Sequence, residues 1–433
     1  MLRSLFPWAI IFLMQLPPSF QENCTYETSW IDKEMIVTCE NITSLDFFKE
    51  DITFNNSVSE IVCLDCNLVY LTDNIFPVSI TILRLANCNI SQISNSVFTD
   101  LALLEELILT SNHINLFPEI FKKLMSLRTL HLAHNHLHSL EYNYFTGLDQ
   151  LEYLFLEGNN LSSIDAEPFR ILKSLKYLYL DENNIAELDK NAFRGLTELT
   201  ILSLSHNEIV TLSGETFNDL TLLESLYLDN NYLLSLPREL FYNQASLTYL
   251  DLSGNDLQLD ETLFEGLNNL LVLYLKNNSI SHLKNGTFQY VPSLTLLDLD
   301  ENLIKSIDSC AFQNLTHLRR LHLENNFVEY INEDTFSDLV KLEILYLQNN
   351  SLDCLHNNTF AGLDSLEELH LENNNITYGE PVICKNESSN ENIDIQLKQD
   401  LFGIEDMKKV LLEDENIVTE NADGDALSEC GNK

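Results

Sequence analysis

The sequence has few basic residues and few glycines. Its 433 residues include 24 Lys and Arg against 66 Asp and Glu, a formal net charge of −42. Phosphates and acidic lipids would be repelled by this excess, so we expect no nucleic-acid partner and no anionic-membrane partner. With only 12 glycines, a glycine-rich nucleotide-binding architecture is not expected either. The 45% hydrophobic content excludes wholesale disorder.

Long apolar runs are absent beyond the start of the chain. An apolar run from Leu5 to Leu16 follows Arg3 and ends at Pro17. It is too short to span a bilayer and is typical of a secretory signal peptide, so residues 1–20 are expected to be removed, with an uncleaved anchor as the alternative. No later stretch is both long and apolar enough for direct membrane insertion, and no hydrophobic tail signals a lipid anchor. We therefore expect a secreted, extracellular, soluble protein.

Glycosylation acceptor sequences agree with export, although an asparagine-rich chain yields several by chance. The candidate acceptors are Asn23, Asn41, Asn55, Asn89, Asn160, Asn277, Asn285, Asn314, Asn349, Asn357, Asn375 and Asn386.

The dominant feature is an internal repeat, L-x-L-x-x-N-x-L. The run from Leu178 to Ile185 recurs 24 residues later as Leu202 to Ile209. Fourteen such units place an asparagine, or in the first two units a cysteine, at regular spacing: 24 residues in ten intervals, 23 in two and 22 in one. We call these the ladder positions: Cys66, Cys88, Asn112, Asn135, Asn159, Asn183, Asn207, Asn231, Asn255, Asn278, Asn302, Asn326, Asn350 and Asn374.

Each repeated residue type has a physical role. The two leucines are expected to point inward from a short strand, and successive strands to stack in parallel. The ladder asparagine follows the strand, where its amide can bind backbone groups of neighbouring coils. Thirteen phenylalanines, each nine or ten residues beyond a ladder position, are expected to fill the other side of the core: Phe76, Phe98, Phe121, Phe145, Phe169, Phe193, Phe217, Phe241, Phe264, Phe288, Phe312, Phe336 and Phe360.

This pattern predicts an α/β repeat solenoid with a parallel β-sheet on a concave face and loops and short turns on a convex face, because 24 residues leave no room for a long outer helix. The repeats resemble the extracellular "typical" leucine-rich repeat family, including the ectodomains of Toll, chaoptin and connectin and secreted insect immune proteins. The resemblance implies a horseshoe fold and a non-enzymatic binding role. We expect a signal peptide at 1–20, an N-terminal cap at 21–57, repeats at 58–384 and an acidic C-terminal cap and tail at 385–433.

Nine cysteines leave at least one thiol over in an oxidising compartment. Cys24 and Cys39 resemble a smaller version of the family's N-terminal cap, with two cysteines in place of four. Cys39–Cys63 is the competing pair. Cys384 and Cys430 are candidates for a C-terminal pair, although Cys354 competes for Cys384. Cys310 lies in a turn, two coils from Cys354 and too far to bridge at the strand spacing. It is therefore the candidate for a free or intermolecular thiol.

No serine, cysteine or histidine lies in a recognisable nucleophile motif, so we expect neither an enzyme nor a cofactor. Four histidines, His131, His134, His136 and His138, lie close in sequence but diverge in the repeat register, which argues against a metal site. A calcium site is the alternative, because carboxylates lie on adjacent strands at Asp298, Asp300 and Glu324.

The outward residues of the strands form three rows on the expected concave face, the surface that repeat proteins most often use for binding. Aromatic and acidic residues are frequent there, which favours rigid aromatic anchors with carboxylates that select a basic partner. Solubility and β-propensity are the alternative explanation. The candidate ligand-binding residues are Tyr153, Phe155, Tyr177, Tyr179, Asp181, Tyr227, Asp229, Tyr249, Asp251 and Tyr274.

We therefore predict a secreted module that binds an extracellular protein ligand through this face, in immune recognition or receptor–ligand signalling. The alternative is a structural protein of cell adhesion or extracellular matrix that works by self-association. A homodimer and a membrane co-receptor both stay open.

Overall fold

The computed structural model describes residues 24–28, 35–45, 58–356 and 358–376. The predicted signal peptide, most of the N-terminal cap, the acidic tail, Cys384, Cys430 and the acceptors Asn23, Asn55, Asn357 and Asn386 lie outside these residues. The chain divides into two compact units, one comprising Met1–Asn184 with Ala192–Glu198 and the other Ile185–Asn191 with Leu199–Lys433. Each unit is described by itself.

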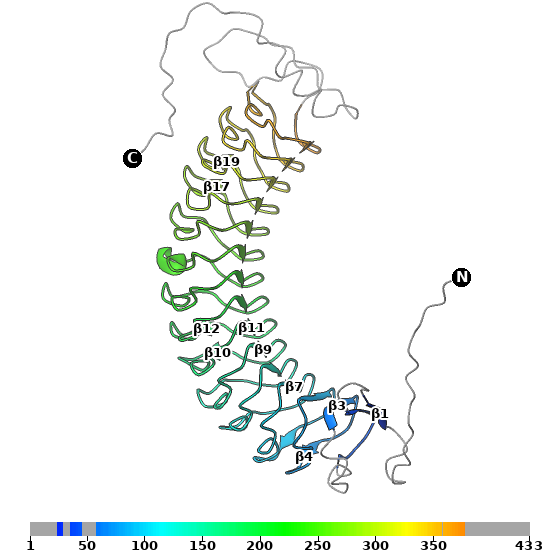
Figure 1. Cartoon of the computed structure of the whole chain (residues 1–433). Coiled ribbons are helices and arrows are strands. Elements are labelled where there is room, and N and C mark those ends of the chain that lie inside the picture. The colour runs from blue at the N-terminus through cyan, green and yellow to red at the C-terminus, as the bar shows by residue number, and fades with distance from the viewer. Residues whose placement is uncertain (1–23, 29–34, 46–57, 357, 377–433) are drawn as a thin grey trace, which may run out of the picture. The chain divides into compact units, whose positions relative to one another are not determined.

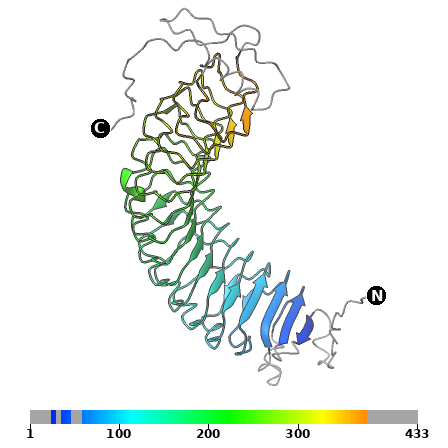
Figure 2. The ribbon, with the colours of Figure 1, turned by 45° about the horizontal axis from the view of Figure 1, so that its top comes forward.

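The sheet of the first unit has eight strands side by side, visible as arrows in Figures 1 and 2. Their order follows the chain, and only the first pair, β1–β2, is antiparallel. The strands are β1 (Cys24–Thr28), β2 (Met35–Glu40), β3 (Val58–Leu64), β5 (Ile82–Ala86), β7 (Glu106–Ile108), β8 (Thr129–His131), β9 (Tyr153–Phe155) and β11 (Tyr177–Tyr179).

The second unit has eight parallel strands of three residues each, again in chain order. They are β13 (Ile201–Ser203), β14 (Ser225–Tyr227), β15 (Tyr249–Asp251), β16 (Val272–Tyr274), β18 (Leu296–Asp298), β20 (Arg320–His322), β21 (Ile344–Tyr346) and β22 (Glu368–His370). Neighbouring strands pair in register, so the residues of one repeat position form straight rows.

The ladder asparagines work as the repeat predicts. Asn255 is buried, and its Nδ2 donates to the carbonyl oxygens of Leu228 and Leu252 at 3.0 Å. Its Oδ1 accepts a hydrogen bond from the Leu233 backbone N–H at 3.0 Å. One side chain therefore satisfies buried backbone groups of its own coil and of the preceding one.

The residue before each ladder asparagine turns the chain out of the strand with a positive φ, for example 51° at His134 and 52° at Asn230. Glycine, which adopts this conformation without strain, takes the position at Gly158 and Gly254.

The predicted phenylalanine row is confirmed. These side chains are buried, and successive rings stack with centroids about 6 Å apart, as in Phe145–Phe169 at 5.9 Å and Phe288–Phe312 at 5.9 Å. On this side of the coils the described chain runs mainly in turns, with one 3₁₀ helix, η2 (Arg238–Phe241). The sequence did not predict the two-residue strands found away from the main sheet: β4 (Tyr70–Leu71), β6 (Gln92–Ile93), β10 (Ser163–Ile164), β12 (Glu187–Leu188), β17 (His282–Leu283) and β19 (Ser306–Ile307).

The cysteines confirm one prediction and correct another. Cys24 and Cys39 form a disulfide between the antiparallel strands β1 and β2. Cys63 lies beside Cys39 in register but is a free buried thiol, so the competing Cys39–Cys63 pair is not formed. The prediction of a free Cys310 is wrong, because Cys310 and Cys354 are both disulfide-bonded.

The error at Cys310 has a simple origin. The strand spacing bears on one partner only, Cys354, and does not show which cysteine is left unpaired. Among the cysteines that the structure describes, the free thiols are three core residues of the first unit, Cys63, Cys66 and Cys88. The predicted fold class, a leucine-rich repeat solenoid with a parallel sheet and turns on its other side, is confirmed in each unit.

Candidate functional site

The candidate site is the solvent side of the strands, which we call the sheet face. It carries three rows: the residue before the first leucine of L-x-L, the residue between the leucines and the residue after the second. All ten candidate ligand-binding residues lie in these rows and are half-buried. They fall into two sets, one in each unit.

The first-unit set comprises Asp181, in the third row, and a ring cluster of Tyr153, Phe155, Tyr177 and Tyr179, which His131 joins. Tyr153 and Tyr177 stack with centroids 4.7 Å apart and planes within 8°. Phe155 stacks between His131, at 3.9 Å, and Tyr179, at 5.1 Å, with both plane angles 4°. Straight register holds these rings parallel, because each lies on the same position of neighbouring strands.

Charged groups flank the ring cluster. Just before the first row, Glu152 pairs with Arg128 and, at 2.8 Å, with Lys176. In the third row, burial raises the pKa of Glu157, and the nearby Asp181 raises it further. The Oε2 atom of Glu157 is buried and accepts no hydrogen bond. A cationic group reaching this row would stabilise the ionised carboxylate.

The second-unit set is a tyrosine–aspartate cluster of Tyr227, Asp229, Tyr249, Asp251 and Tyr274. The Tyr249 ring lies 5.0 Å from Tyr227 and 5.7 Å from Tyr274, tilted by 40° and 50°. The planes of these rings are therefore inclined to one another, unlike the parallel ring planes of the first unit.

The aspartates of this cluster are constrained by local hydrogen bonds. The Asp251 carboxylate accepts from the Ser253 backbone N–H at 2.9 Å, and Asp229 Oδ2 accepts from Asn230 Nδ2 at 2.7 Å. Burial raises the pKa of Asp251 despite the Ser253 hydrogen bond, and the neighbouring Asp229 adds to the rise. Burial, with Asp251 next in effect, also raises the pKa of Tyr249.

Sequence reasoning missed a third group, the imidazole stack of His322, Tyr346 and His370. Tyr346 lies between the two imidazoles, at 4.4 Å from His322 and 4.8 Å from His370. Glu324 Oε1 accepts a hydrogen bond from His322 Nδ1 at 3.0 Å, and two carboxylates, Glu368 and Glu372, lie within 3.6 Å of His370. Counting histidine as a ring in the middle row would have found the group.

The carboxylates considered for calcium have other partners. Asp300 pairs with Lys276 Nζ at 2.7 Å and accepts from Asn325 Nδ2 at 2.7 Å, while Glu324 contacts His322. The Asp300 hydrogen bond raises the pKa of Lys276. Within the part of the chain that the structure describes, no three His, Cys, Asp or Glu residues converge to hold a metal ion.

The histidine group diverges as expected. His131 belongs to the ring cluster, whereas His134 and His136 line an open pocket beside the turns, and His138 is exposed. Among the described residues no helix is both long and apolar enough to span a bilayer.

The repeat geometry agrees with a family match that extends over more than half of the chain. The leucine rich repeat family model matches eleven overlapping stretches: 78–137, 104–161, 125–185, 150–209, 174–233, 197–257, 221–276, 257–304, 268–328, 292–352 and 316–376. The chain belongs to the leucine-rich repeat family. No curated protein sequence matches it.

Solved leucine-rich repeat structures share the fold. Toll in the Drosophila Toll–Spatzle complex has a TM-score of 0.66 at 24% identity, over 81% of this chain and 51% of that chain. A chain of the LRIM1/APL1C complex gives 0.66 at 22%, over 81% and 63%. The APL1 leucine-rich repeat domain gives 0.64 at 22%, over 84% and 96%. This leucine-rich repeat chain thus spans about half the length of the Toll chain.

Proposed function

We propose that this leucine-rich repeat chain is a secreted, non-catalytic binding module that recognises an extracellular protein through its sheet face. The observation that carries the proposal is the pattern of aromatic rings on that face. They are half-buried and held at the strand spacing by the register, parallel in the first unit and tilted by 40° and 50° in the tyrosine–aspartate cluster of the second. Rigid rings with little conformational entropy to lose are the residues that most often anchor protein interfaces.

Carboxylates with raised pKa give the surface a preference for a basic ligand. Asp251 and Asp298 are disfavoured in their ionised form by burial. A lysine or arginine of a partner would supply the missing opposite charge, and the surrounding acids would speed its approach. Two basic residues of the three rows are already engaged, Arg84 by Glu60 and Glu106 and Lys276 by Asp300.

Two further observations support the proposal. The eight glycosylation acceptors that the structure describes are all exposed, and none of them lies in the three rows. Glycans on these asparagines would therefore not be attached to the residues proposed to bind the ligand. Similar leucine-rich repeat proteins have been solved in complexes, Toll with Spatzle and LRIM1 with APL1C. Immune recognition or receptor–ligand signalling is accordingly our leading assignment.

The test begins by crosslinking the native protein in its own extracellular fluid and identifying the captured partner. Its affinity is then measured for Asp229→Lys, Asp251→Lys and Tyr153→Ala, with Glu198→Lys and Glu261→Lys as exposed controls off the three rows. At least one row substitution should weaken binding about tenfold or more, the loss typical of an interface anchor. Unchanged affinity in all three row variants would overturn the proposal.

A second candidate is structural adhesion by self-association. Apolar side chains are exposed on two adjacent coils of the second unit, Val210 at 42%, Tyr232 at 56% and Leu234 at 57%, where Tyr232 N–H donates to Ile209 at 2.9 Å. Sedimentation of the secreted protein separates the candidates: concentration-dependent dimers that disappear in Tyr232→Ser with Leu234→Ser favour adhesion. A stable monomer that captures one ligand favours recognition.

A further inference from the structure

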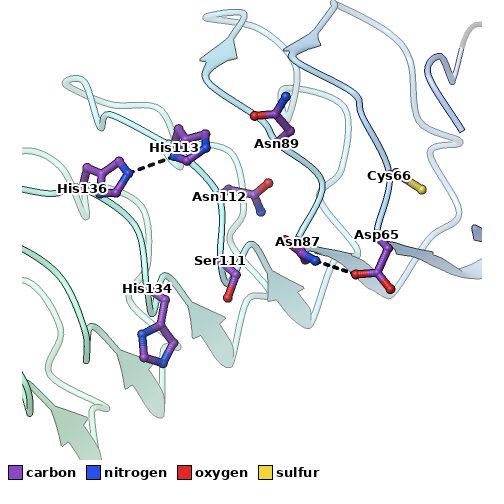
Figure 3. A pocket seen from close by; sticks show the side chains of 9 residues that line it. All are labelled: Asp65, Cys66, Asn87, Asn89, Ser111, Asn112, His113, His134 and His136. Carbon is purple, nitrogen blue, oxygen red and sulfur yellow. Dashed lines mark hydrogen bonds between the residues drawn. The ribbon is translucent and has the colours of Figure 1, made fainter. Parts of the chain in front are cut away.

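A pair of histidines on adjacent coils of the first unit lies apart from the sheet face. His113 Nδ1 and His136 Nε2 are 2.9 Å apart, with ring planes within 17° and centroids at 4.9 Å (Figure 3). Each follows a ladder asparagine, Asn112 or Asn135. One imidazole must therefore offer a lone pair to the other across a shared proton.

The backbone under the pair is fixed. Asn112 and Asn135 are buried, at 2% and 1% exposure. Asn112 Nδ2 donates to Leu85 O at 2.8 Å, and Asn135 Nδ2 donates to Leu109 O at 3.1 Å. These bonds tie neighbouring coils together, so the two imidazoles are held close before any ligand arrives, which lowers the entropy cost of binding.

The surroundings suit a cation. The pair lines an open pocket of about 430 Å³ whose other lining residues are polar apart from one thiol. They include Asp65, Asn87, Asn89 and Ser111, and no lysine or arginine is among the lining residues. Figure 3 shows Asp65 accepting a hydrogen bond from Asn87 on the far side of the pocket from the imidazoles.

We propose that His113 and His136 form a two-imidazole site for a divalent transition metal such as Zn²⁺ or Cu²⁺. The metal takes the place of the shared proton, which moves through solvent to the other nitrogen of the same ring, so that both rings stay neutral. Each ring then supplies one nitrogen at about 2.0–2.1 Å after a small side-chain rotation that both exposed rings can make. The remaining coordination positions are left to water or to a donor atom of a partner. This site is independent of the sheet-face proposal.

His134 is not a third ligand. It lies in the same pocket, but an added Cβ at Gly158 would meet its Nδ1 at 2.1 Å, so its ring packs over Gly158. Figure 3 shows its ring directed away from the pair. The pair accordingly stands as two ligands, consistent with the absence of any three-ligand group among the described residues.

The experiment is Zn²⁺ titration by calorimetry on the full secreted protein in a non-chelating buffer. One bound Zn²⁺ should be seen, and His113→Asn and His136→Asn should each weaken it by at least the roughly 10–100-fold that loss of an outer partner of a metal ligand costs. His138→Asn, at an exposed position nearby, is the matched control and should leave the affinity unchanged.

A competing soft ligand lies in the same pocket. The hydrogen bond from the Cys63 thiol lowers the pKa of Cys66 to about 6, so Cys66 can bind metal as a thiolate. Cys66→Ser should therefore be titrated in parallel and should retain the His-dependent binding. Loss of Zn²⁺ in Cys66→Ser with normal binding in both histidine variants, or no binding at all in the parent protein, would overturn the proposal. Circular dichroism of every variant separates lost ligands from lost folding.

Discussion

The sheet faces of the two units use the same backbone for different surfaces. In the first unit the rings of Tyr153–Tyr177 and His131–Phe155–Tyr179 stack within 8° of parallel. In the tyrosine–aspartate cluster of the second unit the rings are tilted by 40° and 50°, and aspartates alternate with them in the rows. The ring cluster of the first unit thus consists mainly of stacked rings, whereas the tyrosine–aspartate cluster of the second unit alternates rings with partly desolvated carboxylates.

The difference shows where the sequence is constrained. Leucines, ladder asparagines and phenylalanines set the backbone of both units, so the outward rows are free to vary without changing the fold. The surfaces can therefore acquire different binding chemistry on one scaffold. Substitutions in the scaffold should act alike in both units, and substitutions in the rows should not.

The largest expected effect tests the shared scaffold. Asn159→Ala in the first unit and Asn255→Ala in the second should each lower the free energy of unfolding by about 3 kcal/mol, because each leaves buried backbone groups without partners. Asn159 donates to Leu132 and Leu156 and accepts from Leu137, the same pattern as Asn255. Urea denaturation of each variant measures the loss.

The exposed Asn268→Ala is the control for this comparison and should change stability by no more than about 0.5 kcal/mol. If Asn159→Ala and Asn255→Ala differ by several kcal/mol, the two units do not share one scaffold energetically.

A smaller effect should distinguish the two surfaces. A double-mutant cycle between His131 and Phe155 is expected to give a coupling of about 1 kcal/mol, and one between Tyr227 and Tyr249 about 0.5 kcal/mol. The first pair has centroids 3.9 Å apart, the second 5.0 Å with a 40° tilt. Equal couplings, measured by thermal and urea unfolding, would remove the distinction between stacked and tilted rings.

The scaffold could be predicted from the sequence because its physics is periodic. L-x-L, the ladder asparagine and the phenylalanine recur at one spacing, and each has a single energetic role that the structure confirms in Asn255 and Phe288. Cys310 could not be assigned, since disulfide pairing depends on three-dimensional proximity that the repeat register does not supply. The short strands such as β17 depend on backbone contacts between coils and have no side-chain signature.

The surface was predicted less well. Placing Tyr249 and Asp251 on the outward rows needed only the repeat register, and in the structure both flank the buried Leu250 on strand β15 as expected. Their ligand role stays a prediction. The imidazole stack was missed because histidine was considered as a metal ligand and not as a ring. The His113–His136 contact was missed because the two residues are 23 apart in sequence and meet only through the coil spacing.

The smallest effect contrasts one histidine in each unit. Burial lowers the pKa of His131, an effect that nearby Glu106 only partly opposes and Arg84 reinforces. Burial also acts on His322, but the hydrogen bond and charge of Glu324, with Asp298 and Asp300, raise its pKa overall. Titration of the imidazole NMR signals should therefore place His131 below and His322 above the ordinary value of about 6.5.

The stability consequences have opposite signs. Below about pH 6.5 the unfolded chain binds more protons at residue 131 than the native protein, so the contribution of His131 is present above that pH and is lost in acid. Above about pH 6.5 the native protein holds the extra proton at His322, so that contribution is complete at lower pH and is lost as pH rises through the raised pKa. Free energies of unfolding from pH 5 to 8 should show His131→Gln and His322→Gln changing the pH slope in opposite directions, each in its own window. If both variants changed the pH slope in the same direction, the carboxylates around His322 would not raise its pKa, and the proposed electrostatic difference between the two sheet faces would be wrong.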